Sequence, residues 1–325
     1  MKTDTGNKIV AYLRTNKQAR VVDILRHLGI SNQALHKQLA SLLASEQIRK
    51  EGKPPKVFYS LARVSSPNKQ VQVLKPELEQ FIDANYLNIT PDGRKLPGVE
   101  GFRAWCERQK LPLEKTAHEY KSTLEPYLNL RKNDLLDGTR KITGTFDKVW
   151  LDKLYYLDFY SIERFGKTKL GQLVLYAKQS QDRKIIAELI AEIKPKILRM
   201  IGGGRYNAVA FVPPSVKREV QLMKEIEQGL QTGLPTLKIE KIATQIRVPQ
   251  KSLNKLADRV DNARATFVVI DKNRFDKVLL IDDAVGSGAT MNELATKLKE
   301  KGIAKQVDGL AIVGSLKGFD VISEV

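Results

Sequence analysis

The sequence is poor in the residues that build disulfide frameworks and transition-metal sites. Cys106 is the only cysteine among the 325 residues, which excludes a disulfide within one chain and a zinc cluster of several thiolates. The three histidines, His27, His36 and His118, are scattered along the chain. We therefore expect no metal site built on imidazoles.

Long hydrophobic runs are also lacking. The sequence contains no apolar stretch of about 18 residues and no signal peptide. We therefore expect a soluble, cytoplasmic protein that does not contact a membrane. A length of 325 residues with 42% hydrophobic content fits about two domains with ordinary packed cores.

Acidic residues are too few to balance the basic ones. The chain has 55 Lys and Arg against 37 Asp and Glu, a net charge of +18, which favours a polyanionic partner such as DNA, RNA or a phosphorylated metabolite. Residues 1–63 carry a basic surplus of 8, residues 64–148 a surplus of 2, and the remainder a surplus of 8. Both ends of the chain therefore have a larger positive surplus than the middle, and each is expected to attract an anionic partner more strongly.

The amino-terminal region predicts a small helical domain with a basic hairpin. Helices are expected at residues 7–15, 18–28 and 32–44, with Ser31 as the N-cap of the third. Three leucines on one face of the third helix turn polar side chains outward: Asn32, Gln33, His36, Lys37 and Ser41. The segment IRKEGKPPKVFYSL then predicts two short strands around a glycine turn, with basic residues crowding one hairpin: Arg49, Lys50, Lys53 and Lys56.

Roughly residues 5–62 resemble the winged helix-turn-helix family, and the wing GKPPKVFYSL is the most specific part. The resemblance implies a recognition helix in the major groove of double-stranded DNA and a wing on the flanking backbone, in a domain of residues 1–63. The residues expected at DNA are Ser31, Asn32, Gln33, His36, Lys37, Lys50, Lys53 and Lys56. The alternative is a winged helix that contacts protein, with its charges merely solvated.

The middle of the chain, residues 64–148, carries the least information. SSPNK is typical of a linker, and TPDGRKLPG is rich in turn residues. GFRAWCERQ and HEYKSTLEPYLNL predict amphipathic helices. Their inward-facing residues are Phe102, Trp105, Tyr120 and Leu124. We interpret this region as a helical linker or dimerisation segment.

The strongest chemical signal is the stretch VLLIDDAVGSGATMNELATKL at residues 278–298. Residues 278–281 predict a strand buried on both faces, residues 291–301 predict a helix, and residues 307–313 predict the next strand. Such a strand, helix, strand unit joins two parallel strands by a right-handed crossover.

Two acids, Asp282 and Asp283, are expected at the carboxyl end of the first strand, where open α/β sheets bind ligands. Neighbouring carboxylates can accept hydrogen bonds from the 2′ and 3′ hydroxyls of a ribose, and backbone amides of small residues can close on its phosphate. The loop residues are Ala284, Val285, Gly286, Ser287, Gly288, Ala289 and Thr290. The stretch predicts a ribose-5-phosphate site; the alternative is two surface acids before a capped helix.

This stretch resembles the phosphoribosyl pyrophosphate (PRPP) motif of type I phosphoribosyltransferases, which ends Gly-x-Thr. A fuller resemblance, over about residues 150–318, is to the competence-protein ComF branch. It implies an α/β fold for residues 149–325, with a mainly parallel sheet flanked by helices. The chain departs from that branch at Gly286 and Ser287, where the family has two threonines, and it lacks the family's amino-terminal cysteine-rich zinc element.

Two further segments carry the resemblance. LYYLDFYSIERFGKTKLGQLVLYAKQSQDRKIIAELIAEI looks like the opening of the ComF branch, and VPQKSLNKLADRVDNARATF matches its signature at Gln250, Leu253, Arg259, Asn262 and Phe267. By the same resemblance, the loop in AVAFVPPSVKR holds pyrophosphate through Pro214, Ser215, Lys217 and Arg218; the alternative is an ordinary loop. The glycines at 202–204 precede a strand, so we interpret them as a turn rather than a phosphate loop.

Two functions stay open from the sequence. In one, the protein senses PRPP or a nucleotide and regulates transcription through its DNA-binding domain. In the other, it transfers phosphoribosyl from PRPP to a nitrogen base, as in nucleotide salvage, with Mg²⁺ bound through PRPP and no dedicated protein site. The ComF resemblance adds a role near DNA uptake. By family resemblance, we also expect a homodimer.

Overall fold

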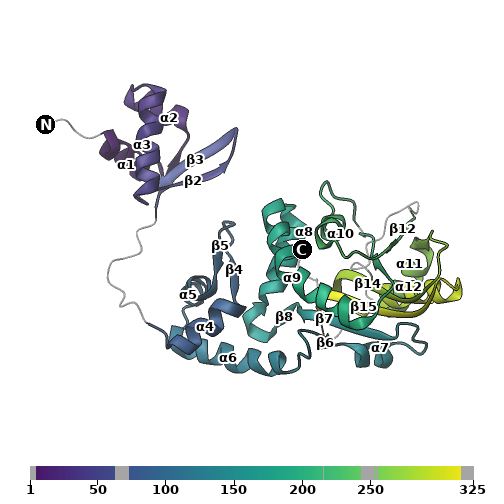
Figure 1. The fold of residues 1–325 in the computed structure, drawn as a ribbon. Helices are drawn as coiled ribbons and strands as arrows, with labels where there is room; N and C mark the ends of the chain where they lie inside the picture. Colours follow the sequence, from purple (N-terminus) through teal and green to yellow (C-terminus); the bar gives the residue numbers. More distant parts are fainter. Residues whose placement is uncertain (1–4, 63–72, 215, 243–252, 254, 316–325) are drawn as a thin grey trace. The chain divides into compact units, whose positions relative to one another are not determined.

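The chain folds into two compact units, Met1–Gln72 and Val73–Val325. The computed structural model describes residues 5–62, 73–214, 216–242, 253 and 255–315 (Figure 1). Each unit has a hydrophobic core of its own. Within the described ranges, no helix is both long enough and apolar enough to cross a bilayer.

The first unit packs helices against a three-stranded antiparallel sheet with strand order β1-β3-β2. Its described elements are α1 (Thr5–Asn16), β1 (Gln18–Ala19), α2 (Val21–Leu28), α3 (Asn32–Ala44), β2 (Ile48–Lys53) and β3 (Lys56–Leu61). Ile9, Ile24 and Leu39 from the helices are buried together with Ile48 and Tyr59 from the hairpin. The hairpin is therefore part of the core of this unit.

The second helix begins later than the sequence pattern predicts. A helix was expected from Gln18, but this residue lies in β1 and pairs with β3. Lys17 has a φ of 60°, which a helix cannot continue through. Arg20 then caps α2, and its backbone N–H donates to the Asp23 carboxylate at 3.2 Å. Sheet pairing and capping therefore move the start of the helix to Val21.

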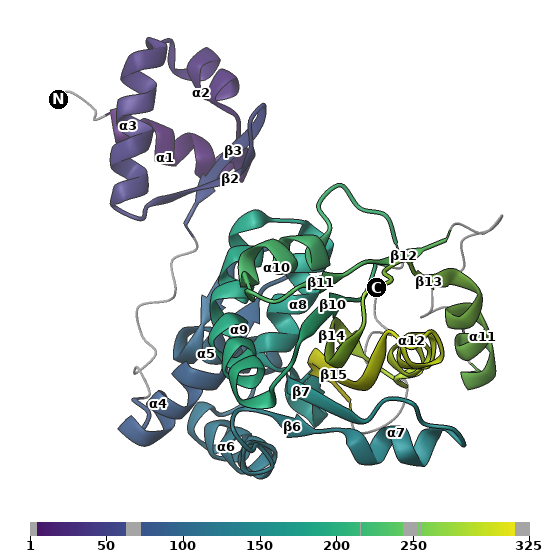
Figure 2. The ribbon, with the colours of Figure 1, turned by 45° about the vertical axis from the view of Figure 1, so that its right-hand side comes forward.

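A six-stranded sheet forms the centre of the second unit, with strand order β11-β10-β14-β15-β7-β6 (Figure 2). All neighbouring strands are parallel except β6, which is antiparallel to β7. The strands are β6 (Leu136–Asp137), β7 (Lys153–Phe159), β10 (Ala208–Phe211), β11 (Thr236–Leu237), β14 (Phe275–Val285) and β15 (Ala304–Gly314). The unit is a mixed α/β structure with a mostly parallel sheet, which confirms the expected α/β class.

Helices cover both faces of this sheet (Figure 2). One face carries α8 (Lys169–Ser180), α9 (Arg183–Gly204) and α10 (Leu222–Leu230), which pack around Leu279 and Ile281 of β14. The other carries α7 (Thr139–Thr145), α11 (Leu256–Thr266) and α12 (Ala289–Glu300), which pack around Val278 and Leu280. The prediction of a strand buried on both faces at residues 278–281 is therefore confirmed.

Short antiparallel pairs flank the central sheet. They are β4 (Leu87–Ile89) with β5 (Lys95–Pro97), β8 (Ser161–Ile162) with β9 (Gly166–Lys167), and β12 (Ile239–Lys241) with β13 (Phe267–Val269). A 3₁₀ turn, η1 (Glu163–Phe165), joins β8 to β9. These two-stranded sheets are separate from the central sheet.

The segment that precedes the sheet belongs to the second unit and contains strands as well as the expected helices. Its helices are α4 (Pro76–Asn85), α5 (Gly98–Gln109) and α6 (Leu113–Asn129). Phe102, Tyr120 and Leu124 are buried and Trp105 packs against them, so their inward orientation is confirmed. Phe165, from beyond β7, lies in the same cluster. The segment thus shares its core with the part of the chain that follows.

The glycines at 202–204 form the last turn of α9 rather than the turn expected from the sequence. A helix that has already formed gains one backbone hydrogen bond for each residue added, while the cost of starting it has been met. Ile186, Ile193 and Ile197 hold the rest of α9 in the core. The helix ends at Arg205, whose φ is 54°. Packing along the helix therefore outweighs the weak propensity of glycine.

Candidate ligand-binding site

The acid pair lies near the carboxyl edge of the sheet. β14 continues through Asp282 and Asp283 to Val285, so the strand is longer than the apolar run indicates. Phe211, the last residue of β10, pairs in parallel with Ile281. The loops that follow β10 and β14 therefore leave adjacent strands at the same edge, where ligands bind in open α/β sheets.

The loop between β14 and α12 carries backbone amides without acceptors directly before a helix. Gly288 has a φ of 84° and precedes the first helical residue, Ala289. No described residue accepts a hydrogen bond from the backbone N–H of Gly286, Ser287 or Gly288. The unpaired amides lie at the start of a 12-residue helix, where the helix dipole is positive. Free amides and the dipole both favour an anion at such a position. The predicted phosphate loop thus has amides without described acceptors. The helix begins at Ala289, two residues before the predicted Met291.

This loop is covered by α7. A Cβ added to Gly288 would lie 2.2 Å from Ile142 Cδ1 and 3.9 Å from Phe146 Cε2. Ser287, in the same loop, is only 6% exposed. Lys141 of the same helix donates to the backbone oxygen of Ser315, just after β15. No local sequence pattern predicts this cover, because α7 precedes the loop by more than 140 residues and the contact depends on the fold.

Asp282 and Asp283 differ in their surroundings. Asp283 is 6% exposed and forms an ion pair with Lys178 of α8, whereas Asp282 is only partly buried. The Asp283 backbone N–H donates to the Asp282 Oδ1 at 2.8 Å, which fixes the Asp282 carboxylate against the chain. Lys178 was not among the predicted site residues, although it lies in a segment that carries the family resemblance. Only the fold brings it to the acid pair.

Although Asp282 is partly exposed, desolvation of its carboxylate raises the pKa of Asp282 well above its ordinary value of 3.8, and the neighbouring Asp283 carboxylate raises it further. The Lys178 ammonium acts in the opposite direction. Among the described residues, no group of three or more His, Cys, Asp or Glu side chains is placed to hold a metal ion.

The loop after β10 lies beside the acid pair. The Val212 backbone N–H donates to Ile281 O at 2.9 Å, which ties the start of the loop to β14. Pro214 and Arg218 are partly buried and Lys217 is exposed. Neither cation is within ion-pair distance of a described carboxylate. Ser215, the fourth predicted residue of this loop, lies outside the described residues.

Two of the predicted signature residues, Arg259 and Asn262, fall on α11, which packs against α12, while Phe267 begins β13. Arg259 donates from Nε to Leu253 O at 2.7 Å, and the Asn262 backbone oxygen accepts from Thr266 Oγ1 at 2.6 Å. The buried Asn262 Oδ1 has no hydrogen-bond partner in the structure. Both hydrogen bonds are local to the segment that forms α11. Gln250 lies outside the described residues.

The predicted DNA-facing residues of the first unit lie on two exposed elements. Ser31 caps α3, its Oγ accepting from the Ala34 N–H at 3.2 Å, so the predicted cap is confirmed. Leu35, Leu39 and Leu42 are buried, and the polar residues of α3 are exposed: Asn32, Gln33, His36, Lys37 and Ser41. Lys50 and Lys56 are exposed on the hairpin, while the side chain of Lys53 is outside the described part.

Comparisons with known proteins give only weak likenesses. No family model and no curated protein matches the chain. Among solved structures, the chain is similar to a hypoxanthine phosphoribosyltransferase from Staphylococcus aureus, with 12% identity and a TM-score of 0.25. The likeness covers 40% of this chain and 64% of that one, so less than two thirds of the known enzyme is spanned. A likeness this weak carries no argument about activity.

Proposed function

We propose that the second unit is a type I phosphoribosyltransferase-like domain that binds PRPP or a nucleotide, and that the first unit is a winged helix-turn-helix domain that binds double-stranded DNA. The protein is then a transcriptional regulator that senses this ligand. The observation that carries the ligand half is the position of the acid pair directly before a loop whose amides have no acceptor among the described residues.

Each part of the carboxyl edge has a role in this proposal. Asp282 accepts from the ribose hydroxyls, and Asp283, held by Lys178, positions it. The amides of the loop and the start of α12 hold the 5′-phosphate. Lys217 and Arg218 lie in the adjacent loop and neutralise a pyrophosphate. The phosphates of the ligand would carry Mg²⁺ into the site, where the ion would supply charge neutralisation.

The order of elements supports the DNA half. A helix, a short strand, two helices and a hairpin follow one another in the first unit, with the sheet order β1-β3-β2. α3 follows a left-handed Gly29 and keeps its polar face exposed, as a recognition helix requires. Basic residues on α3 and the hairpin supply contacts to phosphate. In this proposal the wing is formed by β2 and β3.

The ligand half is tested by thermal unfolding with PRPP and Mg²⁺. A ligand bound only by the folded state raises the melting temperature by mass action. Asp282→Asn with Asp283→Asn should abolish this shift, whereas Asp276→Asn, an exposed acid on the same strand, should keep it. A full shift in the double variant would remove the ribose assignment.

A second measurement separates a sensor from an enzyme. The intact protein is incubated with PRPP, Mg²⁺ and each nucleobase in turn, and pyrophosphate release is followed. A sensor gives the thermal shift without release. Steady release that depends on one base, and that is lost in the Asp282 and Asp283 double variant, would replace the regulatory proposal with a phosphoribosyl transfer.

A further inference from the structure

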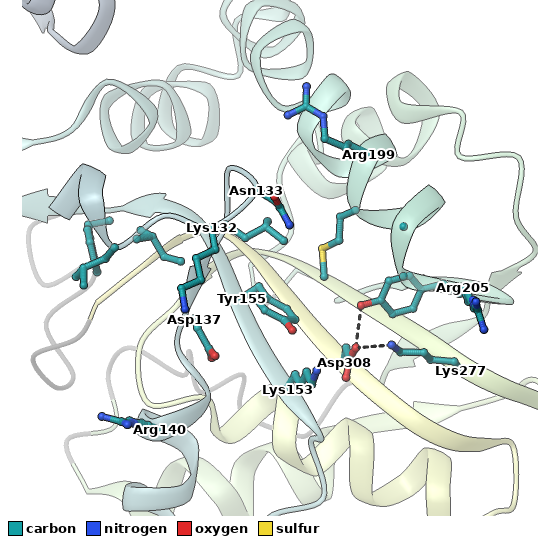
Figure 3. A pocket seen from close by; sticks show the side chains of 18 residues that line it. Lys132, Asn133, Asp137, Arg140, Lys153, Tyr155, Arg199, Arg205, Lys277 and Asp308 are labelled. Carbon is teal, nitrogen blue, oxygen red and sulfur yellow. Dashed lines mark hydrogen bonds and ion pairs between the residues drawn. The ribbon is translucent and has the colours of Figure 1, made fainter.

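A cavity of about 970 Å³ lies on the α9 face of the sheet, next to the edge strand β6 (Figure 3). Its walls come from the end of α9, the segment between α6 and β6, and the first residues of β7. None of its lining residues belongs to the acid pair or to the loop that follows it. The cavity is therefore separate from the candidate ligand site.

The lining of this cavity is strongly basic. Six Lys or Arg side chains line it against two carboxylates, those of Asp137 and Asp308. Arg199 is paired with Asp134 and Lys277 with Asp308. Four cations have no carboxylate within ion-pair distance in the described part of the chain: Lys132, Arg140, Lys153 and Arg205. Such a concave group of uncompensated like charges attracts an anion.

The carboxylate at the floor of the cavity is already neutralised. Asp308 is 2% exposed, accepts from the Tyr206 hydroxyl at 2.8 Å and pairs with Lys277 at 3.1 Å, as the dashed lines in Figure 3 show. The Lys277 ammonium also lies 4.6 Å from the centre of the Tyr206 ring. The end of α9 adds about half a negative charge, which the four unpaired cations outweigh. The Asp308 carboxylate is therefore held in place, and the paired Lys277 offsets its repulsion of an anion.

The cavity also offers an apolar surface and a hydrogen-bond acceptor. Tyr155 is partly buried and lines the cavity with Leu135 and Met200. Asp137 is exposed, and its Cα is the cross-strand partner of that of Tyr155. Lys153 is likewise the cross-strand partner of Asp308. An aromatic ring, a carboxylate and several cations therefore lie within one cavity, as Figure 3 shows.

We infer that this cavity binds a nucleoside phosphate. The phosphate groups lie against Lys132, Lys153 and the other unpaired cations, the base packs on Tyr155, and Asp137 accepts from an amino or hydroxyl group of the nucleoside. The volume exceeds the 300 Å³ that is about the lower limit for small-molecule sites. This site does not depend on PRPP binding at the carboxyl edge.

Calorimetric titration of the intact protein with ATP, AMP and inorganic phosphate, without metal ion, tests the inference. Lys132→Ala with Lys153→Ala should weaken ATP binding by at least about 10-fold, since charged hydrogen bonds to phosphate are lost. Tyr155→Leu should weaken ATP and AMP but not phosphate. Lys115→Ala, an exposed lysine on α6, is the matched control and should leave all three unchanged.

Two further variants separate this site from the carboxyl edge. Arg205→Ala, at an exposed position, should weaken ATP binding by itself and guards against misfolding of the double variant. Asp282→Asn with Asp283→Asn should leave ATP binding unchanged. The inference is overturned if no ATP binds, if phosphate alone binds as tightly as ATP, or if the acid-pair variant loses ATP binding while the lysine variants keep it.

Discussion

Lys178 on α8 and Asp283 on β14 form an ion pair across 105 residues of sequence. The Asp283 side chain is 9% exposed and that of Lys178 is 24% exposed. A carboxylate in this position loses much of its hydration, and the Lys178 ammonium offsets part of that loss. The pair therefore ties the acid edge of the sheet to one covering helix.

Removing Lys178 should destabilise the second unit. Lys178→Met keeps the length of the side chain but leaves the Asp283 carboxylate without a cation, which should lower the free energy of unfolding by about 1–3 kcal/mol, less than for a fully buried pair because Lys178 is partly hydrated. Urea unfolding measures the loss. In a double-mutant cycle, Asp283→Asn should recover part of it; strictly additive losses would show that the two groups do not interact.

Gly288 should be intolerant of a side chain. Gly288→Ala places a Cβ 2.2 Å from Ile142 Cδ1 at a φ of 84°, and we expect a loss of about 2–3 kcal/mol from contact and backbone strain together. Gly302→Ala is the matched control: its φ is 65° but its Cβ would have no neighbour within 4 Å, so only about 1 kcal/mol should be lost. Equal losses at both glycines would contradict the close contact with α7.

Lys141 should make stability depend on pH in the alkaline range. Burial lowers the pKa of Lys141 from 10.5 to about 8. Between these values the unfolded chain binds more protons than the folded one, so this group makes the free energy of unfolding rise with pH. Lys141→Met should remove that rise, seen as the difference from wild type in denaturation between pH 8 and 10.5. The exposed Lys115→Met should keep it; an unchanged slope in Lys141→Met would refute the shift.

The first unit should bind duplex DNA with a steep dependence on salt. Because Lys50 and Lys56 are exposed on the hairpin, replacing both with Ala should weaken binding to all sequences alike and reduce the salt slope by about 2. Gln33→Ala should instead change sequence preference. Lys8→Ala, on the exposed side of α1, serves as the control. Absence of measurable duplex binding at low salt would favour a winged helix that contacts protein.

Ligand and DNA binding should be coupled if the regulatory proposal is correct. We expect a homodimer whose DNA affinity changes by about 5-fold or more when PRPP fills the carboxyl edge, since a ligand that prefers one of two states shifts their balance. DNA titrations with and without saturating PRPP, on wild type and on the Asp282 and Asp283 double variant, measure this. Equal affinities in all four conditions would leave the two units functionally independent.

The sequence predicted the parts of the fold that depend on local pattern. The apolar run at 278–281 and the helix after it were placed correctly, because burial on both faces and helical periodicity are properties of consecutive residues. The pairing of Lys178 with Asp283 was out of reach, since it depends on how α8 crosses the sheet. The same holds for Ile142 over Gly288. The local pattern also predicted a helix from Gln18, which was wrong, because Gln18 pairs with β3 instead.

Ile142 and Phe146 lie against Gly288 in the loop that holds the unpaired amides. If α7 has to open before an anion binds these amides, arrival and capture are separate events in time. At high ligand concentration the observed binding rate then stops rising and equals the rate at which α7 opens, a motion of the microsecond to millisecond class. The protein would respond to its ligand at a pace set by its own helix rather than by diffusion.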